Sequence, residues 1–431
     1  MFIRQIIGRI RGEKRKERVR TEVEELKKAL LNDPEFREEI LKELEYRTGR
    51  RDLLKAGVLG LLGLAAGSGV GVAAAGNETA RETISDYTGV KIPKPCTAIV
   101  SQDGTGDYDV LRNEDASEVI QRAIDYAAKK GGGEVRIREG EYKITNTVFI
   151  RHFIKIAGSG HKTLLKLDNC VNKNIFETSQ YAQMQVIIKD IKIDGNRKNN
   201  NRGSAIHCRL WDSVIQNVVI QNMPEHGIDL RNKGLNIPNN STSRDDNKII
   251  ACSIRKCGGV GIYTSPVLKI IGCDLGHNDI YVCENAVRIT STNIYGATIW
   301  IENKESIAII GNHISVDGAK VGVKVLAKNG YSCKDIQIIG NDFRGAAKTL
   351  IDIESYSGCT ISNVIIQGNT FNARNNDIDR ASEYGVRIRG SGVIENLLIK
   401  NNIFTGKFLN DIFVNNAKVS NNIIFSDNII S

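Results

Sequence analysis

The sequence predicts an all-β protein, a right-handed parallel β-helix over residues 97–431 with a capping helix at its N-terminal end. The first indication is a recurring four-residue phrase that ends in Asn or Cys. Four copies begin with two Ile residues, and the last two copies begin with a single Ile. The phrase occurs at residues 249–252, 270–273, 309–312, 338–341, 366–369 and 399–402. The second indication is an apolar-x-apolar segment that accompanies each coil. Repeats with constant strands and variable loops are typical of solenoids, in which each coil contacts only its neighbours.

Each phrase is expected to be a strand that ends in a tight turn. Asn side chains stacked at this turn, at the strand spacing of about 4.8 Å, can hydrogen-bond along the axis. Cys252 above Cys273 fits the same position and lies within disulfide reach. Most of the nine cysteines are therefore expected to be ladder residues, since no CxxC or Cys/His spacing indicates a metal site. A leucine-rich horseshoe is the competing solenoid, but its Leu-x-x-Leu-x-Leu pattern is absent.

The capping helix is predicted from residues 115–118, Asp-Ala-Ser-Glu, which form a capping box before apolar residues at helical spacing. Glycines 131–133 end this helix, and strands are expected at 134–137 and 142–144. This order resembles the opening of the pectate-lyase-like superfamily, in which a helix closes the first coil of a right-handed β-helix. The resemblance continues through the rest of the chain, and it implies a carbohydrate-active protein with a polysaccharide partner.

The residues before the β-helix have three different compositions. Residues 1–49 form a charged leader with apolar residues at helical spacing, and residues 76–96 read as a linker with two prolines. Between them, Arg50 and Arg51 precede apolar residues, a Lys and an uncharged Ala/Gly/Leu run up to residue 75, which resembles a twin-arginine export signal. The resemblance implies recognition by export machinery through Arg50 and Arg51 and an extracellular or cell-surface location. A membrane anchor is the alternative, and membrane attachment is expected only if the segment stays uncleaved.

The formal charge of +9 does not indicate nucleic-acid binding, because much of the Lys and Arg lies in the first fifty-odd residues. No aromatic-rich basic stripe accompanies the charge in the remainder of the chain. A weakly positive surface suits an acidic polysaccharide instead.

The alternation within each coil separates inward from outward residues. The inward positions are Ile206, Ile228, Ile262, Ile280, Ile299, Val323, Ile351, Val386 and Ile412. The outward row that follows them is His207, Asp229, Tyr263, Tyr281, Trp300, Lys324, Asp352, Arg387 and Phe413. Its three consecutive aromatic residues, Tyr263, Tyr281 and Trp300, are called the aromatic rail below. Sugar rings stack on such surfaces, although a loop folded over the rail would bury it instead.

Two groups of candidate site residues follow from this row. His207, Arg209, Asp229, Arg231 and Tyr263 are the candidate catalytic residues, and Tyr281, Trp300 and Lys324 are the candidate substrate-binding residues. Arginine binds a uronate carboxylate bidentately, which lowers the cost of charge at C5, while His or Tyr takes or returns a proton. The alternative is a salt-bridge network that only neutralises this face. The sequence indicates no metal ligands, and it neither requires nor excludes Ca²⁺.

Residues 225–231, Glu-His-Gly-Ile-Asp-Leu-Arg, resemble the Tyr-Gly-Phe-Asp-Pro-His segment of mannuronan C5-epimerases. The resemblance places Asp229 on the catalytic Asp, with Arg231 where that family has His and His226 in place of its Tyr. Polygalacturonases are the second comparison, but a glycoside hydrolase normally uses two carboxyl groups and Asp229 has no acidic neighbour in its row. The sequence therefore favours β-elimination or C5 epimerisation of an acidic glycan. A polygalacturonase-like hydrolase and a non-catalytic glycan-binding adhesin remain the alternatives.

Overall fold

The computed structural model describes residues 96–430, except 112–113, 180–181, 232–245, 317–320, 346–347, 374–381, 416–417 and 420–421. The predicted leader, the twin-arginine segment and nearly all of the linker therefore lie outside the described residues. The described residues belong to a compact unit, Pro95–Ser431, whose first strand is β1 (Cys96–Ser101). Within the described ranges, no helix is long and apolar enough to cross a membrane.

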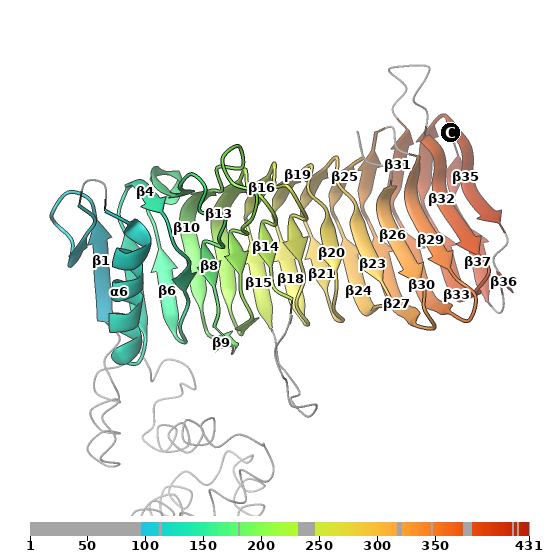
Figure 1. Cartoon of the computed structure of the whole chain (residues 1–431). Helices are drawn as coiled ribbons and strands as arrows, with labels where there is room; N and C mark the ends of the chain where they lie inside the picture. Colours follow the sequence, from blue (N-terminus) through green and yellow to red (C-terminus); the bar gives the residue numbers. More distant parts are fainter. Residues whose placement is uncertain are drawn as a thin grey trace, which may run out of the picture. The chain divides into compact units, whose positions relative to one another are not determined.

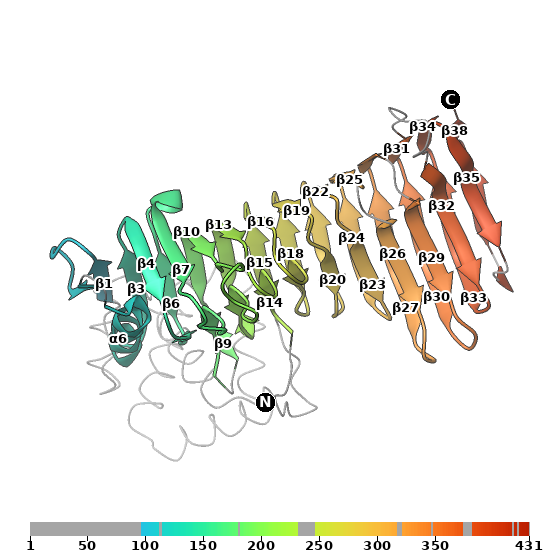
Figure 2. The ribbon, with the colours of Figure 1, turned by 45° about the horizontal axis from the view of Figure 1, so that its top comes forward.

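The unit is a parallel β-helix, as predicted, and every strand pairing in it is parallel (Figures 1 and 2). One face is an 11-stranded sheet, in which each strand pairs with its equivalent in the next coil. Its strands are β5 (Val148–Phe149), β8 (Phe176–Glu177), β11 (Ile206–His207), β14 (Ile228–Asp229), β17 (Ile262–Tyr263), β20 (Ile280–Val282), β23 (Ile299–Glu302), β26 (Val321–Ala327), β29 (Thr349–Ser355), β32 (Ser382–Gly390) and β35 (Phe408–Asn415). The strands lengthen toward the C-terminal end of the helix.

The remaining faces belong to a 25-stranded sheet, because several of its strands bend and contribute to two faces. The first half of β10 pairs with β6 and its second half pairs with β7, with Asp190 between the halves at a φ of 55°. The strands are β1, β2 (Tyr108–Asp109), β3 (Gly133–Ile137), β4 (Gly140–Ile144), β6 (Ile154–Ala157), β7 (Thr163–Leu167), β10 (Ile187–Asp194), β13 (Val214–Gln221), β15 (Asn247–Ile250), β16 (Ser253–Arg255), β18 (Leu268–Ile271), β19 (Asp274–Gly276), β21 (Arg288–Thr290), β22 (Asn293–Tyr295), β24 (Glu305–Ile310), β25 (His313–Ser315), β27 (Ser332–Ile339), β28 (Asp342–Arg344), β30 (Thr360–Gln367), β31 (Thr370–Ala373), β33 (Val393–Lys400), β34 (Ile403–Gly406), β36 (Lys418–Val419), β37 (Ile423–Ser426) and β38 (Ile429–Ile430). A separate pair, β9 (Gln183–Met184) and β12 (Leu210–Trp211), completes the strands.

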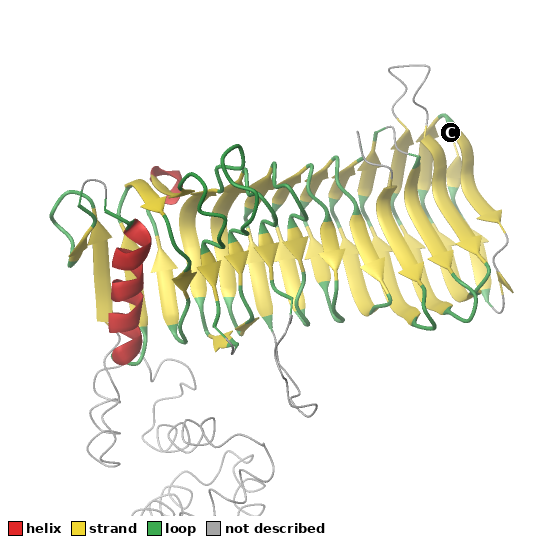
Figure 3. Cartoon of the chain, in the orientation of Figure 1, coloured by secondary structure: helices red, strands yellow, loops and turns green. Residues whose placement is uncertain are grey.

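The predicted capping helix is α6 (Ala116–Lys129), shown in red at one end of the solenoid in Figure 3. The carboxylate of Asp115 accepts a hydrogen bond of 3.0 Å from the backbone N–H of Ser117, which satisfies one of the free donors of the first turn. Its apolar stripe, which includes Val119, Ile120 and Ile124, is fully buried and packs over the first coils. The helix thus covers apolar side chains that an open first coil would expose to water.

The interior is formed by stacked apolar side chains and by a buried Asn ladder. Asn312, Asn341, Asn369 and Asn402 hydrogen-bond through their carboxamides from one coil to the next at 2.9–3.0 Å. Each carboxamide also donates to a backbone carbonyl inside the helix, for example from Asn341 to Ile309 at 2.9 Å. Cys252 and Cys273 continue the column as buried free thiols, a position that the sequence predicted. The ladder holds successive coils in one register.

Candidate functional site

The strand register predicted from the alternation is confirmed along the 11-stranded sheet from β11 to β35. Ile206 pairs with Ile228, Ile228 with Ile262, and the pairing continues coil by coil to Ile412. The outward row therefore runs as expected, from His207 on β11 to Phe413 on β35. Two earlier members, Phe149 and Glu177, extend it toward the capping helix.

Asp229 is the centre of the first group of polar side chains on this face. Its carboxylate is 1% exposed and forms a bidentate pair with Arg231, at 2.8 Å from Nε to Oδ1 and 2.6 Å from Nη2 to Oδ2. The backbone N–H of Arg231 donates to Oδ1 at 3.1 Å, and Nδ1 of His207 lies 3.3 Å from Oδ2. Asp229 therefore fixes the orientation of both a guanidinium group and an imidazole ring.

The surroundings change the pKa values of these groups in opposite directions. Burial alone would raise the pKa of Asp229, but the hydrogen bonds from Arg231 and His207 outweigh it and hold the pKa well below its usual range. The hydrogen bond to Asp229 raises the pKa of His207 above its usual value, although burial opposes the change. Asp229 is thus a permanent anion, and His207 is a stronger base than a free imidazole.

Tyr263 lies on the next coil and packs directly against this group. The guanidinium carbon of Arg231 lies 3.4 Å from the centre of the Tyr263 ring, a close cation–π contact. The ring of His226 meets Tyr263 edge-on, with 4.8 Å between centroids. Burial raises the pKa of Tyr263, against the lowering effect of Arg231, so the phenol keeps its proton at neutral pH.

The aromatic rail continues from Tyr263 along the same face. The ring centroids of Tyr263 and Tyr281 are 5.5 Å apart, and those of Tyr281 and Trp300 are 6.4 Å apart with only 16° between the ring planes. All three side chains are half-buried, and no described loop covers them completely. The rail is held at its edges, because the Tyr281 hydroxyl donates to Glu302 at 2.8 Å and Nε1 of Trp300 donates to Asp279 at 3.2 Å.

Arg209 and Lys324 take part in other contacts than those expected from the sequence. Arg209 is 8% exposed, and its guanidinium lies 5.4 Å from the ring of Trp211. Lys324 is 4% exposed and forms ion pairs with Asp352 and Glu354. Asp352 and Glu354 lie two residues apart on one strand, a spacing that in the sequence also fits a solvated edge, but both carboxylates are buried among cationic side chains.

Sequence reasoning missed Asp279 as a residue that orients the rail. It lies two positions before Tyr281 on the same outward phase, so extending the alternation by one position toward the preceding turn would have found it. Glu302 lies two residues after Trp300 on β23, and its hydrogen bond to Tyr281 depends on side-chain reach rather than on strand register. The sequence predicts that its longest polar insertion, Asn232 to Asn247, rises beside the site, but residues 232–245 lie outside the described residues.

Among the residues that the structure describes, no group of three or more His, Cys, Asp or Glu side chains is placed to hold a metal ion. An open cavity of about 730 Å³ lies elsewhere, along the turns that follow β10, β13, β16 and β19, and none of the candidate residues lines it. Its polar lining includes the basic residues Arg197, Lys198 and Lys256. The ordered contacts of the outward row, rather than this open cavity, identify the candidate site.

No protein-family model and no curated protein sequence matches the chain. Solved structures do: a tailspike protein mutant of an E. coli bacteriophage in complex with a pentasaccharide has a TM-score of 0.58 and 16% identity, over 77% of this chain and 66% of that chain. The A-module of a mannuronan C-5 epimerase from Azotobacter vinelandii has a TM-score of 0.45 and 15% identity, over 77% of this chain and 100% of that chain. An exopolygalacturonase from Thermotoga maritima has a TM-score of 0.45 and 12% identity, over 71% of this chain and 87% of that chain. The tailspike likeness shows a shared right-handed β-helix fold, and at these identities it shows no shared activity.

Proposed function

We propose that the chain binds an acidic polysaccharide along the outward face of the 11-stranded sheet and modifies it by β-elimination or C5 epimerisation. The observation that carries the proposal is the arrangement of Arg231 and His207, both oriented by Asp229, at one end of a half-exposed aromatic rail. The rail supplies surfaces for sugar rings, and Arg231 supplies a fork for a uronate carboxylate. The tailspike protein of the same fold is in complex with a pentasaccharide, which is consistent with a carbohydrate ligand.

In this proposal each group has a separate role. Arg231 neutralises the uronate carboxylate and so stabilises the negative charge that develops when the C5 proton leaves. Because Nδ1 of His207 faces Asp229, Nε2 is the ring nitrogen that remains for substrate, and in the neutral ring it accepts the C5 proton. Asp229 touches no substrate in this scheme and acts as a positioning residue.

The two reactions differ in the second proton transfer. In β-elimination the C4–O bond breaks, a double bond forms between C4 and C5, and the Tyr263 hydroxyl gives its proton to the leaving oxygen. In epimerisation no bond to the ring oxygen or to C4 breaks, and a proton returns to C5 from the opposite face. The protonated phenol of Tyr263 suits either donor role.

Glycoside hydrolysis fits the structure less well than these reactions. It needs a carboxylic acid with a raised pKa beside a second carboxylate. The pKa of Asp229 lies well below its usual range and that of Asp352 is lowered to about 2, so both are anions at neutral pH. A non-catalytic adhesin is the second candidate, because the pairing of Asp229 with Arg231 also satisfies both charges without substrate.

The test is incubation of the purified chain with uronate polysaccharides and matched neutral glycans, with and without added Ca²⁺. Absorbance of unsaturated uronates reports elimination, reducing ends without that absorbance report hydrolysis, and deuterium entering C5 in heavy water reports epimerisation. Binding without any of these products would support the adhesin. If the chain neither binds nor modifies any of the acidic glycans, the proposal is refuted.

A further inference from the structure

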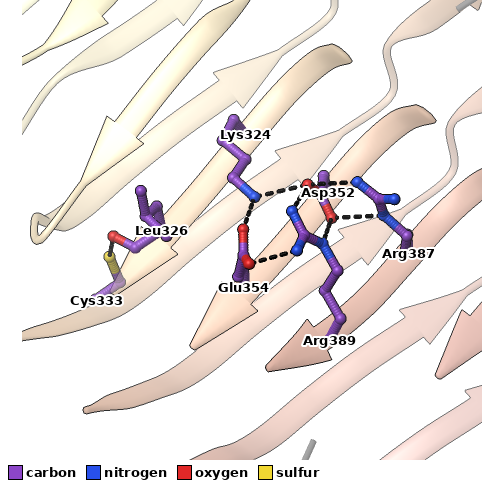
Figure 4. Close-up of polar contacts among 7 residues, drawn as sticks. All are labelled: Lys324, Leu326, Cys333, Asp352, Glu354, Arg387 and Arg389. Carbon is purple, nitrogen blue, oxygen red and sulfur yellow. Dashed lines mark hydrogen bonds and ion pairs between the residues drawn. The ribbon is translucent and has the colours of Figure 1, made fainter. Parts of the chain in front are cut away.

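A second group of charged side chains lies on the same outward face, on the far side of the aromatic rail. Figure 4 shows the contacts within this group. Asp352 accepts from Lys324 at 2.6 Å, from Arg387 at 3.0 and 2.9 Å, and from Arg389 at 3.2 and 3.1 Å. Glu354 accepts from Lys324 and Arg389. These five residues are called the arginine cluster below.

The arginine cluster carries more positive than negative charge. Three cationic groups surround two carboxylates, and the hydrogen bonds from Arg387, Arg389 and Lys324 outweigh burial and lower the pKa of Asp352 to about 2. A carboxylate with this pKa stays ionised across the physiological range. The cluster therefore keeps an excess of one positive charge, which suits an anionic ligand.

The two guanidinium groups are oriented toward the carboxylates and still have donors left. A guanidinium has five N–H donors, and the contacts with Asp352 and Glu354 engage only some of them on Arg387 and on Arg389. The Arg389 side chain is 36% exposed, whereas the Asp352 side chain beneath it is 1% exposed. The carboxylates thus hold rigid a pair of forks that solvent, or a ligand, can reach.

Aromatic side chains flank the arginine cluster as they flank Arg231. The Tyr384 ring lies 5.4 Å from the guanidinium carbon of Arg387 and 4.9 Å from the ring of Phe413, which is the next member of the outward row. Tyr356, which directly follows β29, is 49% exposed. A guanidinium fork beside a ring surface is suited to a sugar that carries a carboxylate.

We infer that Arg387 and Arg389 form a second subsite, which binds a carboxylate of the same acidic glycan at a distance from the reacting sugar. The inference rests on the proposed function. Asp229 and Asp352 are five strand steps apart, or about 24 Å at about 4.8 Å per step. Only a glycan that crosses the whole rail reaches both Arg231 and the arginine cluster, so the second subsite makes affinity depend on glycan length.

The experiment measures binding of oligogalacturonates and oligomannuronates, from disaccharide to polymer, to the full chain by calorimetry. Arg389→Gln keeps a polar, shorter side chain and removes the charge and the fork. We expect this variant to bind the polymer about tenfold more weakly, the loss of one charge-assisted contact, and the disaccharide with less than a twofold change. Arg389→Lys keeps the charge in the cluster, and we expect a smaller loss with the same length dependence.

Arg344→Gln is the matched control, because Arg344 also pairs with a carboxylate, Asp342, but lies on β28 of the other sheet. Its affinities should equal those of the wild type at every length. Equal affinity of folded Arg389→Gln for every oligomer would overturn the second subsite, and so would a loss of the same size at every length. If Trp300→Ala weakens binding while Arg389→Gln does not, only the second subsite fails. If the wild type binds no oligouronate, the proposed function and the second subsite both fail.

Discussion

Replacing Asp229 by Asn tests whether the carboxylate orients Arg231 and His207, because the change keeps the shape and removes only the charge. The side chain of Asp229 is 1% exposed, and those of Arg231 and His207 are 16% and 35% exposed. Hydrogen bonds between charged groups contribute about 1.5–3 kcal/mol, and breaking a fully buried ion pair costs about 3–5 kcal/mol. Since water still reaches the two cations, we expect Asp229→Asn to lower the free energy of unfolding by about 2 kcal/mol and to abolish turnover.

The pH dependence of this difference has a definite sign. The pKa of Asp229 is lowered by folding, so its stabilising effect is present above its unfolded value of about 4 and is lost as the pH falls through the folded value. The pKa of His207 is raised by folding, so its contribution is present below about 6.5 and is lost as the pH rises through the folded value. The stability gap between wild type and Asp229→Asn should therefore be widest between these limits and shrink toward acid.

Urea unfolding at several pH values measures the gap, and an NMR titration of His207 measures its pKa, which should fall toward the usual value in the variant. Asp342→Asn is the matched control, because Asp342 also binds an Arg and a His, through Arg344 at 2.8 Å and His313 at 3.0 Å, but is about one-third exposed. Its cost should stay below about 1 kcal/mol. An unchanged pKa of His207 in Asp229→Asn, or full activity of that variant, would refute the positioning role.

Three further predictions concern the rail, the ladder and export. Trp300→Ala should weaken glycan binding by about 1–3 kcal/mol at an unchanged melting temperature; a lower melting temperature with unchanged affinity would mean that the ring only packs against the fold. Asn341→Ala should lower the free energy of unfolding by about 3 kcal/mol in urea titration, because it removes the side-chain partners of the buried carbonyl of Ile309 and of the backbone N–H of Asn312. Changing both Arg50 and Arg51 to Lys should keep the protein in the cytoplasm on cell fractionation, and unchanged export would contradict the twin-arginine interpretation.

The register of the outward row was predictable from sequence because side chains alternate with a period of two and the inward positions are almost all apolar. A one-residue error would have placed Asp229 or Lys324 in the core, so the correct alignment was strongly favoured. The contacts among the outward side chains were not predictable in the same way. Lys324 was expected to face substrate, yet its long side chain reaches the carboxylates of the next coil and is buried by them. Strand register places the Cβ atoms, whereas ion pairing decides where a long side chain ends.

The same stacking rule explains why charge on this face comes in clusters. Parallel strands in register place equivalent side chains about 4.8 Å apart, so a charged residue in one coil must be neutralised by its neighbours in the next coils. Asp229 is neutralised by His207 and Arg231, and Asp352 by Arg387 among others. The aromatic rail separates the two clusters and needs no such compensation. Each cluster uses a buried carboxylate to hold partly exposed cationic groups. This arrangement contributes little to the binding of a neutral glycan, but it favours the binding of a polyanion that contacts both clusters at once.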